Sequence, residues 1–104
     1  KFIFLVNLFH LISEDEATIL ISEISAALAP GGRSIIHGPF KRNNKLTSAG
    51  DQTFHQSLIE SDPLIGYKND AWMIAEFKEA KLELIKVVPM PANNLAFICE
   101  KPRM

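Results

Sequence analysis

The sequence has only one cysteine, Cys99, in 104 residues. A single thiol cannot form an internal disulfide or a multi-thiolate metal site, so we expect a protein of the reducing cytoplasm. There is also no excess of basic side chains, because 11 Lys and Arg against 12 Asp and Glu leave a net charge of −1. This balance excludes nucleic acid or an anionic membrane as a partner held by bulk charge.

Long hydrophobic runs are missing as well. The apolar stretch over residues 2–12 is interrupted by Asn7 and His10, and it is shorter than the roughly 20 residues that a membrane-spanning helix needs. A secretory signal peptide is the competing interpretation, because residues 27–29 (Ala-Leu-Ala) resemble a cleavage site. The acidic residues 14–16 argue against it. Since the chain opens inside a strand-like stretch without Met, we expect a segment to be missing upstream.

What is present is the composition of an ordinary soluble globular protein, with 47% hydrophobic and 22% charged residues. The length suits one domain, and no repeat, low-complexity tract or linker divides the chain. We therefore expect residues 1–104 to form a single domain.

The opening residues predict a strand and a helix. Phe2–Val6 is a continuous run of aromatic and branched side chains, typical of a strand buried on both faces of a parallel sheet. Ser13 and Glu16 have the spacing of a capping box, which begins a helix. Apolar residues then recur every three or four positions, and the helix ends before Pro30.

A second strand is predicted over Arg33–His37. It runs into Gly38-Pro39, where the missing backbone donor of proline ends sheet pairing. Strand, helix and strand together form a right-handed βαβ unit. Such a unit places the strand ends, residues 7–10 and 37–40, along one edge of the sheet, which is where open α/β sheets bind ligands.

The middle of the chain predicts a loop and a short helix. Residues 41–45 are polar and have no periodicity, which indicates a loop. Ser48 or Asp51 can cap the helix that follows, and Asp62-Pro63 ends it because the residue before proline disfavours helical geometry. This helix is an insertion beside the ligand edge.

The last third predicts one more helix and two strands. Asp70 can cap a helix that ends near Ala80. Residues 82–88 and 95–99 are predicted strands, and the turn-rich residues 89–94 between them are too few for a helical crossover. The two strands are therefore expected to be antiparallel neighbours.

These features, in this order, resemble the C-terminal half of a class I S-adenosylmethionine-dependent methyltransferase. The most familiar piece is Leu28-Ala29-Pro30-Gly31-Gly32-Arg33. Several loops narrow the resemblance to the methyltransferase-like family DUF938. They are Gly38-Pro39-Phe40-Lys41, Leu46-Thr47-Ser48-Ala49-Gly50, Phe54, Asp62-Pro63, Gly66 and Met90-Pro91-Ala92-Asn93-Asn94. The similarity covers essentially all 104 residues.

The resemblance implies an α/β fold, the C-terminal half of a Rossmann-like domain with parallel strands and a terminal antiparallel pair. It implies S-adenosylmethionine as the cofactor and a small acceptor of unknown identity. The sequence departs from the family pattern in one respect, because none of its five glycines forms the glycine-rich turn that holds the cofactor. We therefore expect this chain to be a fragment that binds the cofactor weakly or not at all and is inactive alone.

The resemblance also assigns roles to residues after the first strand. It implies that Asn7 and Leu8 contact the cofactor and that His10 is the catalytic general base, since an ordinary histidine pKa lies close to neutrality. The alternative is structural: Asn7 caps the strand end and His10 bonds a nearby carbonyl.

Six further residues are expected to bind the acceptor. Phe40 can equally be a core residue. Thr47 and Ser48 can equally be helix caps. The asparagines satisfy a tight turn equally well, and Tyr67 and Trp72 are expected to pack rather than bind. The six are Pro39, Phe40, Thr47, Ser48, Asn93 and Asn94.

Other chemistry lacks support. His10, His37 and His55 are too scattered for a zinc site, so we expect no metal. Cys99 lies in an apolar strand without the cationic surroundings that make a thiolate.

A non-enzymatic alternative stays open, namely a truncated domain that is stabilised by self-association. The first strand would lie in the middle of the complete sheet, so its outer edge would present unpaired backbone groups. We therefore expect a homodimer through this strand, or pairing with the missing N-terminal half.

Overall fold

The computed structural model describes residues 2–103 as a mixed α/β fold with one four-stranded sheet. The order of elements along the chain confirms the sequence prediction. The elements are β1 (Phe2–Val6), the 3-10 turn η1 (Phe9–Leu11), α1 (Glu14–Ala27), β2 (Arg33–Pro39), α2 (Ala49–Ser61), α3 (Asp70–Glu79), β3 (Glu83–Met90) and β4 (Asn94–Glu100).

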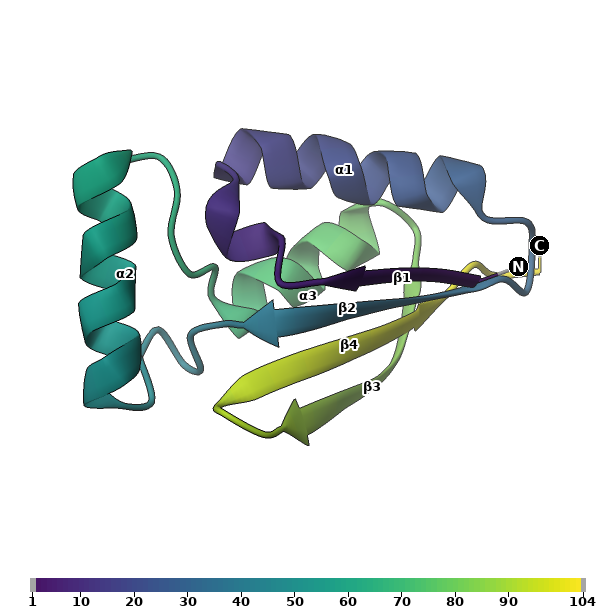
Figure 1. Ribbon diagram of the computed structural model, residues 1–104. Helices are drawn as coiled ribbons and strands as arrows, with labels where there is room; N and C mark the ends of the chain where they lie inside the picture. Colours follow the sequence, from purple (N-terminus) through teal and green to yellow (C-terminus); the bar gives the residue numbers. More distant parts are fainter. Residues whose placement is uncertain (1, 104) are drawn as a thin grey trace.

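The sheet has the strand order β1-β2-β4-β3. β1 runs parallel to β2, with Phe4 opposite Ile35, as the βαβ prediction requires. β4 is antiparallel to both β2 and β3, which confirms the predicted terminal pair. The C-terminal ends of β1 and β2 therefore meet at one edge of the sheet (Figure 1).

Two local predictions need correction. β2 continues to Pro39, which lies opposite Asn94, because proline at the last position of a strand loses only a donor and keeps its carbonyl. The N-cap of α3 is Asn69 rather than Asp70, and neither side chain caps the helix in the usual way. Instead their Oδ1 atoms accept hydrogen bonds from the backbone N–H groups of Asn44 and Asn43, which ties the 41–45 loop to α3.

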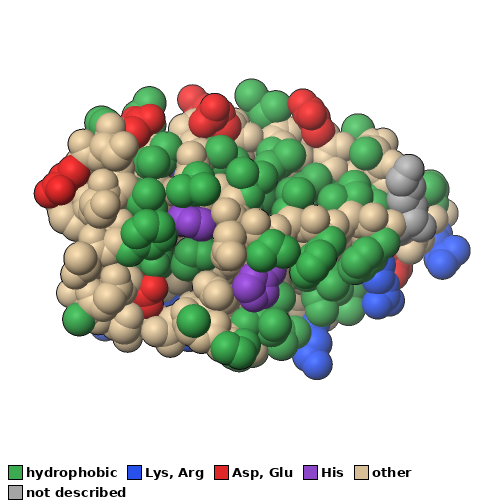
Figure 2. Space-filling model, in the orientation of Figure 1, with side chains coloured by type: hydrophobic (Ala, Val, Ile, Leu, Met, Phe, Trp, Pro, Cys, Tyr) green, Lys and Arg blue, Asp and Glu red, His purple; other side chains and the backbone are tan. Residues whose placement is uncertain are grey.

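The burial predicted for β1 is also wrong. β1 is an edge strand of the described sheet, and its side chains at alternate positions, Phe2, Phe4 and Val6, are 59%, 57% and 46% exposed. They lie in register with Arg33, Ile35 and His37 of β2. Within residues 2–103 no helix lies over this face of the sheet (Figure 1), and hydrophobic side chains gather on it (Figure 2). We call it the open face.

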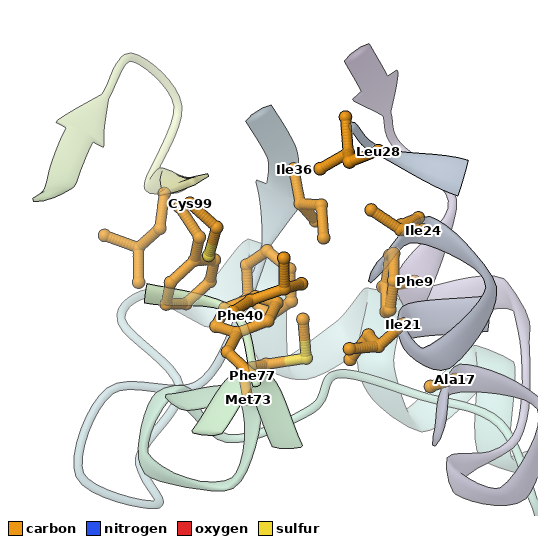
Figure 3. Packing of buried hydrophobic residues seen from close by; sticks show 13 residues of the cluster. Phe9, Ala17, Ile21, Ile24, Leu28, Ile36, Phe40, Met73, Phe77 and Cys99 are labelled. Carbon is orange, nitrogen blue, oxygen red and sulfur yellow. The ribbon is translucent and has the colours of Figure 1, made fainter. Parts of the chain in front are cut away.

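The core lies on the other face, under α1 and α3. Phe97 of β4 is fully buried at its centre, and its ring meets Phe40 at 4.9 Å and Phe77 at 5.5 Å between centroids. Figure 3 shows Phe40 and Phe77 close together, with Phe9 and Ile21 on the α1 side. This packing fixes β1 and β2, and therefore the strand ends that follow them.

α2 stands apart from these layers. It lies beyond the C-terminal ends of β1 and β2, where the sequence predicted an insertion beside the ligand edge (Figure 1). Its N-cap is Ser48, whose side chain accepts from the N–H of Asp51, and its C-cap is Asp62. No helix within the described residues has the length and apolar character to cross a bilayer.

Candidate functional site

The candidate site begins at the C-terminal end of β1. Asn7 adopts a left-handed φ of 56° and its N–H donates to the His37 carbonyl at 2.8 Å, so the chain turns sharply there. The turn places His10 in η1, where it is only 6% exposed. The Nδ1 atom of His10 is buried and has no hydrogen-bond partner within residues 2–103. A buried unpartnered nitrogen is costly, and this makes His10 a candidate for binding a ligand group.

Aromatic rings surround His10. Its ring centroid lies 5.6 Å from that of Phe54 in α2 and 6.2 Å from that of Tyr67, and Phe54 and Tyr67 are 6.2 Å apart. Phe54 is 43% exposed, whereas Tyr67 is buried. The three rings join η1, α2 and the segment before α3, and Phe54 gives the group an apolar surface open to solvent.

His55 connects α2 to the same segment. Its Nδ1 accepts a hydrogen bond from the backbone N–H of Tyr67 at 3.0 Å. Gly66 has a φ of +133°, and a Cβ at this position would lie 2.8 Å from Cε1 of His55. Only glycine allows the chain to pass the imidazole in this conformation.

Asp51 is the polar centre of the site. Its Oδ1 accepts a 2.7 Å hydrogen bond from the Tyr67 hydroxyl. Its Oδ2 accepts from the hydroxyls of Thr47 and Ser48, both at 2.9 Å, and from Nδ2 of Asn93 at 3.3 Å. Partial burial raises the pKa of Asp51, but the bonds from Tyr67, Thr47, Ser48 and Asn93 outweigh it and lower the pKa below its ordinary value.

A buried lysine lies beside the aromatic group. Lys68 is 3% exposed, and its Nζ donates to the carbonyls of Ile12 and Gly66. Burial lowers the pKa of Lys68, while Glu14 and Glu16 act in the opposite direction. Lys68 and Tyr67 also line a cavity of about 360 Å³ between the start of α1 and residues 63–68.

The two histidines of the site predict an acid-sensitive fold. Burial, followed by the charge of Lys68, lowers the pKa of His10, and burial followed by Lys41 and Lys68 lowers that of His55. A folded-state pKa below the unfolded value of 6.5 means that the unfolded chain binds protons first. The free energy of unfolding is therefore expected to fall as the pH drops below about 6.5. Urea titrations at several pH values measure this, and equal stability at pH 7.5 and pH 5.5 would contradict it.

The structure brings only part of the predicted site together. Asn7 and Leu8 lie at the sheet edge, exposed and half-buried. The ring of Phe40 is 2% exposed in the core, as the alternative interpretation expects, and is closed to the site surface. Pro39 is buried in β2, opposite the half-buried Asn94.

Three of the predicted acceptor-binding residues do converge. Thr47, Ser48 and Asn93 all hydrogen bond to Asp51. Ser48 is also the N-cap of α2, so its structural interpretation holds as well. Asn94 instead offers its backbone carbonyl to a guanidinium nitrogen of Arg42 at 3.0 Å.

Sequence reasoning missed the roles of Asp51 and Lys68. The sequence predicts Asp51 as a helix cap, and Lys68 gives no signal in the sequence, because its burial depends in part on the carbonyl of Ile12, which lies 56 positions away in the chain. Tyr67 was expected to pack, which it does, but it also bonds Asp51. Within residues 2–103 no group of three or more His, Cys, Asp and Glu side chains is placed to hold a metal ion.

Solved structures of methyltransferases share this fold. An O-methyltransferase family 2 protein from Planctomyces limnophilus, in complex with apigenin, superposes with a TM-score of 0.85 over 96% of this chain at 19% identity. An O-methyltransferase family protein from Burkholderia thailandensis gives 0.82 over 97% at 16% identity. Human N-acetylserotonin methyltransferase in complex with SAM gives 0.80 over 97% at 12% identity. The chain therefore has the fold of the C-terminal part of class I S-adenosylmethionine-dependent methyltransferases.

The family follows from the sequence itself. Residues 1–101 match the family described as Protein of unknown function (DUF938), and the chain belongs to that family. It spans 30%, 30% and 29% of the lengths of the three solved chains above.

Proposed function

We propose that this chain forms the acceptor side and one wall of the cofactor site of an S-adenosylmethionine-dependent methyltransferase. The observation that carries the proposal is His10, a buried histidine with an unpartnered Nδ1 at the edge where two parallel strands end. This is the edge at which open α/β sheets bind ligands. The shared fold of the solved methyltransferases supports the same placement.

The residues at the strand ends fit one side of the cofactor. When bound, S-adenosylmethionine supplies an activated methyl group. Asn7 offers an exposed amide and Leu8 a half-buried apolar side chain, which suit a polar and an apolar contact. The 104 residues contain no glycine-rich turn for close backbone approach. The chain alone therefore binds the cofactor weakly and is inactive.

His10 acts as the general base in this proposal. Its low pKa, caused by burial and then by Lys68, keeps the imidazole neutral near pH 7 and able to take a proton. The imidazole would accept the proton that the acceptor hydroxyl loses, and the cofactor, when bound, would supply the methyl group and leave as the neutral thioether once its sulfur–methyl bond is broken. The exposed part of Phe54 provides a flat apolar contact for the acceptor.

A small aromatic molecule with a hydroxyl group is the acceptor class that suits this surface. The exposed ring of Phe54, which packs against the buried ring of Tyr67, favours a planar ligand. Among the solved structures of this fold, one is a complex with apigenin and another is an N-acetylserotonin methyltransferase. Thr47, Ser48 and Asn93, which meet at Asp51, provide polar groups beside these rings.

Transfer of a labelled methyl group tests the proposal. A full-length member of the family that also has the glycine-rich turn is incubated with labelled S-adenosylmethionine and a panel of hydroxylated aromatic compounds. We expect label in at least one hydroxylated compound and none in its methoxy analogue. The 104-residue chain in calorimetric titration with the same cofactor is expected to bind more weakly than micromolar. Absence of transfer to every hydroxylated compound, despite tight cofactor binding, would reject the acceptor class.

A second candidate function is self-association, which the open face favours. We propose that β1 of one copy pairs with β1 of another, because the strand has a free edge in the described sheet and exposes Phe2, Phe4 and Val6. Unpaired edges beside apolar surface promote such pairing. A twofold arrangement would continue the sheet across the two copies and bring these side chains of both copies side by side on the open face.

Sedimentation analysis of the purified chain checks the self-association. We expect a species of twice the mass of one chain, and a monomer when Phe4→Lys places a charge in the middle of the exposed strand. Ile19→Lys is the matched control, because Ile19 is 58% exposed on α1, away from β1. A monomeric native chain at all concentrations would exclude the dimer.

A further inference from the structure

The two oxygens of the Asp51 carboxylate have separate partners. Oδ1 accepts only from the Tyr67 hydroxyl, at 2.7 Å, among the hydrogen bonds of the described residues. Oδ2 holds Thr47, Ser48 and Asn93. Asn93 lies in the turn between β3 and β4. The carboxylate is therefore hydrogen bonded both to the start of its own helix and to a turn that is distant in the sequence. Asp51 is thus a fixed acceptor for Tyr67.

Tyr67 in turn restrains His10. Its ring meets the imidazole edge to face, at 6.2 Å and an interplanar angle of 76°. The neighbouring Gly66 donates its N–H to the carbonyl of His10 at 3.0 Å, so the backbone of η1 is held by the same segment. The Nδ1 atom of the imidazole has no hydrogen-bond partner within residues 2–103. Its orientation therefore depends on the rings packed against it.

We propose that Asp51 is a positioning residue for His10, and that it acts through the Tyr67 hydroxyl. The hydrogen bond fixes the Tyr67 ring, and the ring with Phe54 fixes the plane of the imidazole and shields it from water. The inference rests on the proposed function only in giving His10 a reaction to perform. The linkage between the three side chains can be measured without any reaction.

The surroundings of His10 determine in which direction its pKa is expected to change when the contact with Tyr67 is loosened. Lys68 faces His10 from the segment before α3, and Glu14 and Glu16 of α1 act on Lys68. The ring of His55 packs against the other side of the group, 5.5 Å from the ring of Tyr67. Burial, followed by the hydrogen bond to Asp51, raises the pKa of the Tyr67 phenol. The phenol therefore stays protonated and keeps donating at neutral pH. Loosening Tyr67 admits water to His10, which relieves the burial that lowers its pKa.

The test is an NMR titration of the histidine side chains in the 104-residue chain. Tyr67→Phe removes only the hydroxyl and keeps the ring, while Asp51→Ala removes the acceptor. Each is expected to raise the pKa of His10 towards 6.5, its ordinary value, and the double variant is expected to add nothing to the larger single shift. Asn93→Ala is the matched control, because it removes the longest bond to Oδ2, at 3.3 Å, while Thr47 and Ser48 still hold the carboxylate and the Tyr67 bond stays in place.

Tyr67→Phe decides the outcome even if Asp51→Ala does not fold. A folded Tyr67→Phe chain with the His10 pKa and ring shifts of the native chain would overturn the positioning role, whatever its melting temperature. The same result in Asn93→Ala as in Tyr67→Phe would also overturn it, because general loosening of α2 would then be the cause.

The methyl-transfer assay separates this inference from the proposed function. In the full-length enzyme, Tyr67→Phe is expected to lower kcat by roughly 10-fold to 100-fold with little change in KM, and to move the acid limb of the pH profile to higher pH. A coupled His10 titration without any methyl transfer rejects the proposed function and leaves the linkage standing. Methyl transfer that needs His10 but ignores the Tyr67 hydroxyl rejects the linkage alone.

Discussion

Replacing Phe97 with alanine is expected to lower the free energy of unfolding by about 3–5 kcal/mol. Phe97 is fully buried in β4, an inner strand that pairs with both β2 and β3. Its ring contacts Phe40 and Phe77, so truncation removes an aromatic side chain and leaves a cavity between the sheet and α3. Small domains have only about 5–15 kcal/mol of net stability, so this loss is a large share of the whole.

Urea denaturation followed by circular dichroism measures the effect. Phe97→Leu retains most of the apolar volume and is expected to fall between the native chain and the alanine variant. Ile19→Ala is the exposed control and is expected to change stability by no more than about 0.5 kcal/mol. A Phe97→Ala chain as stable as the Ile19→Ala chain would show that the core does not depend on this ring.

The parts of the fold that depend on neighbouring residues could be predicted from the sequence. Ser13 and Glu16 form their capping box within one turn, and both of its hydrogen bonds are present. The end of α2 at Asp62 follows from the proline beside it. The exposure of Phe2 and Phe4 could not be predicted, because an apolar strand has the same sequence pattern whether or not another layer covers that face of the sheet.

In the candidate site, too, the features that depend on local sequence could be predicted and those that depend on distant residues could not. The position of His10 at the ligand edge follows from the βαβ unit, because parallel strands end on the same side. The meeting of Asp51 with Tyr67 and Asn93 could not be predicted, because these residues are 16 and 42 positions away in the chain. Only the folded arrangement of α2 against the β3–β4 turn brings them together.

Under the proposed function, His10→Gln at the matching position of the full-length family member in the transfer assay is expected to reduce kcat by about 100-fold to 10,000-fold, the usual contribution of a general base. Glutamine approximates the size and polarity of histidine but cannot take the proton. The proposed site places acceptor binding at Phe54 and the groups around Asp51, so KM is expected to change little. His37→Gln is the control, because His37 lies on the open face in register with Val6.

The pH profile distinguishes a base from a residue that only shapes the site. Because burial and then Lys68 lower the pKa of His10, the native activity is expected to persist below pH 6.5 before it falls, and His10→Gln removes that limb. A structural role would lower the rate equally at every pH and leave the limb in place. A phenolic acceptor of the proposed class would ionise at about pH 10, as the tyrosine side chain does, so a rate that rises steeply with pH in His10→Gln would mean that solvent hydroxide has replaced the imidazole. That recovery at high pH, absent from the native profile and from His37→Gln, would locate the lost proton acceptor at residue 10.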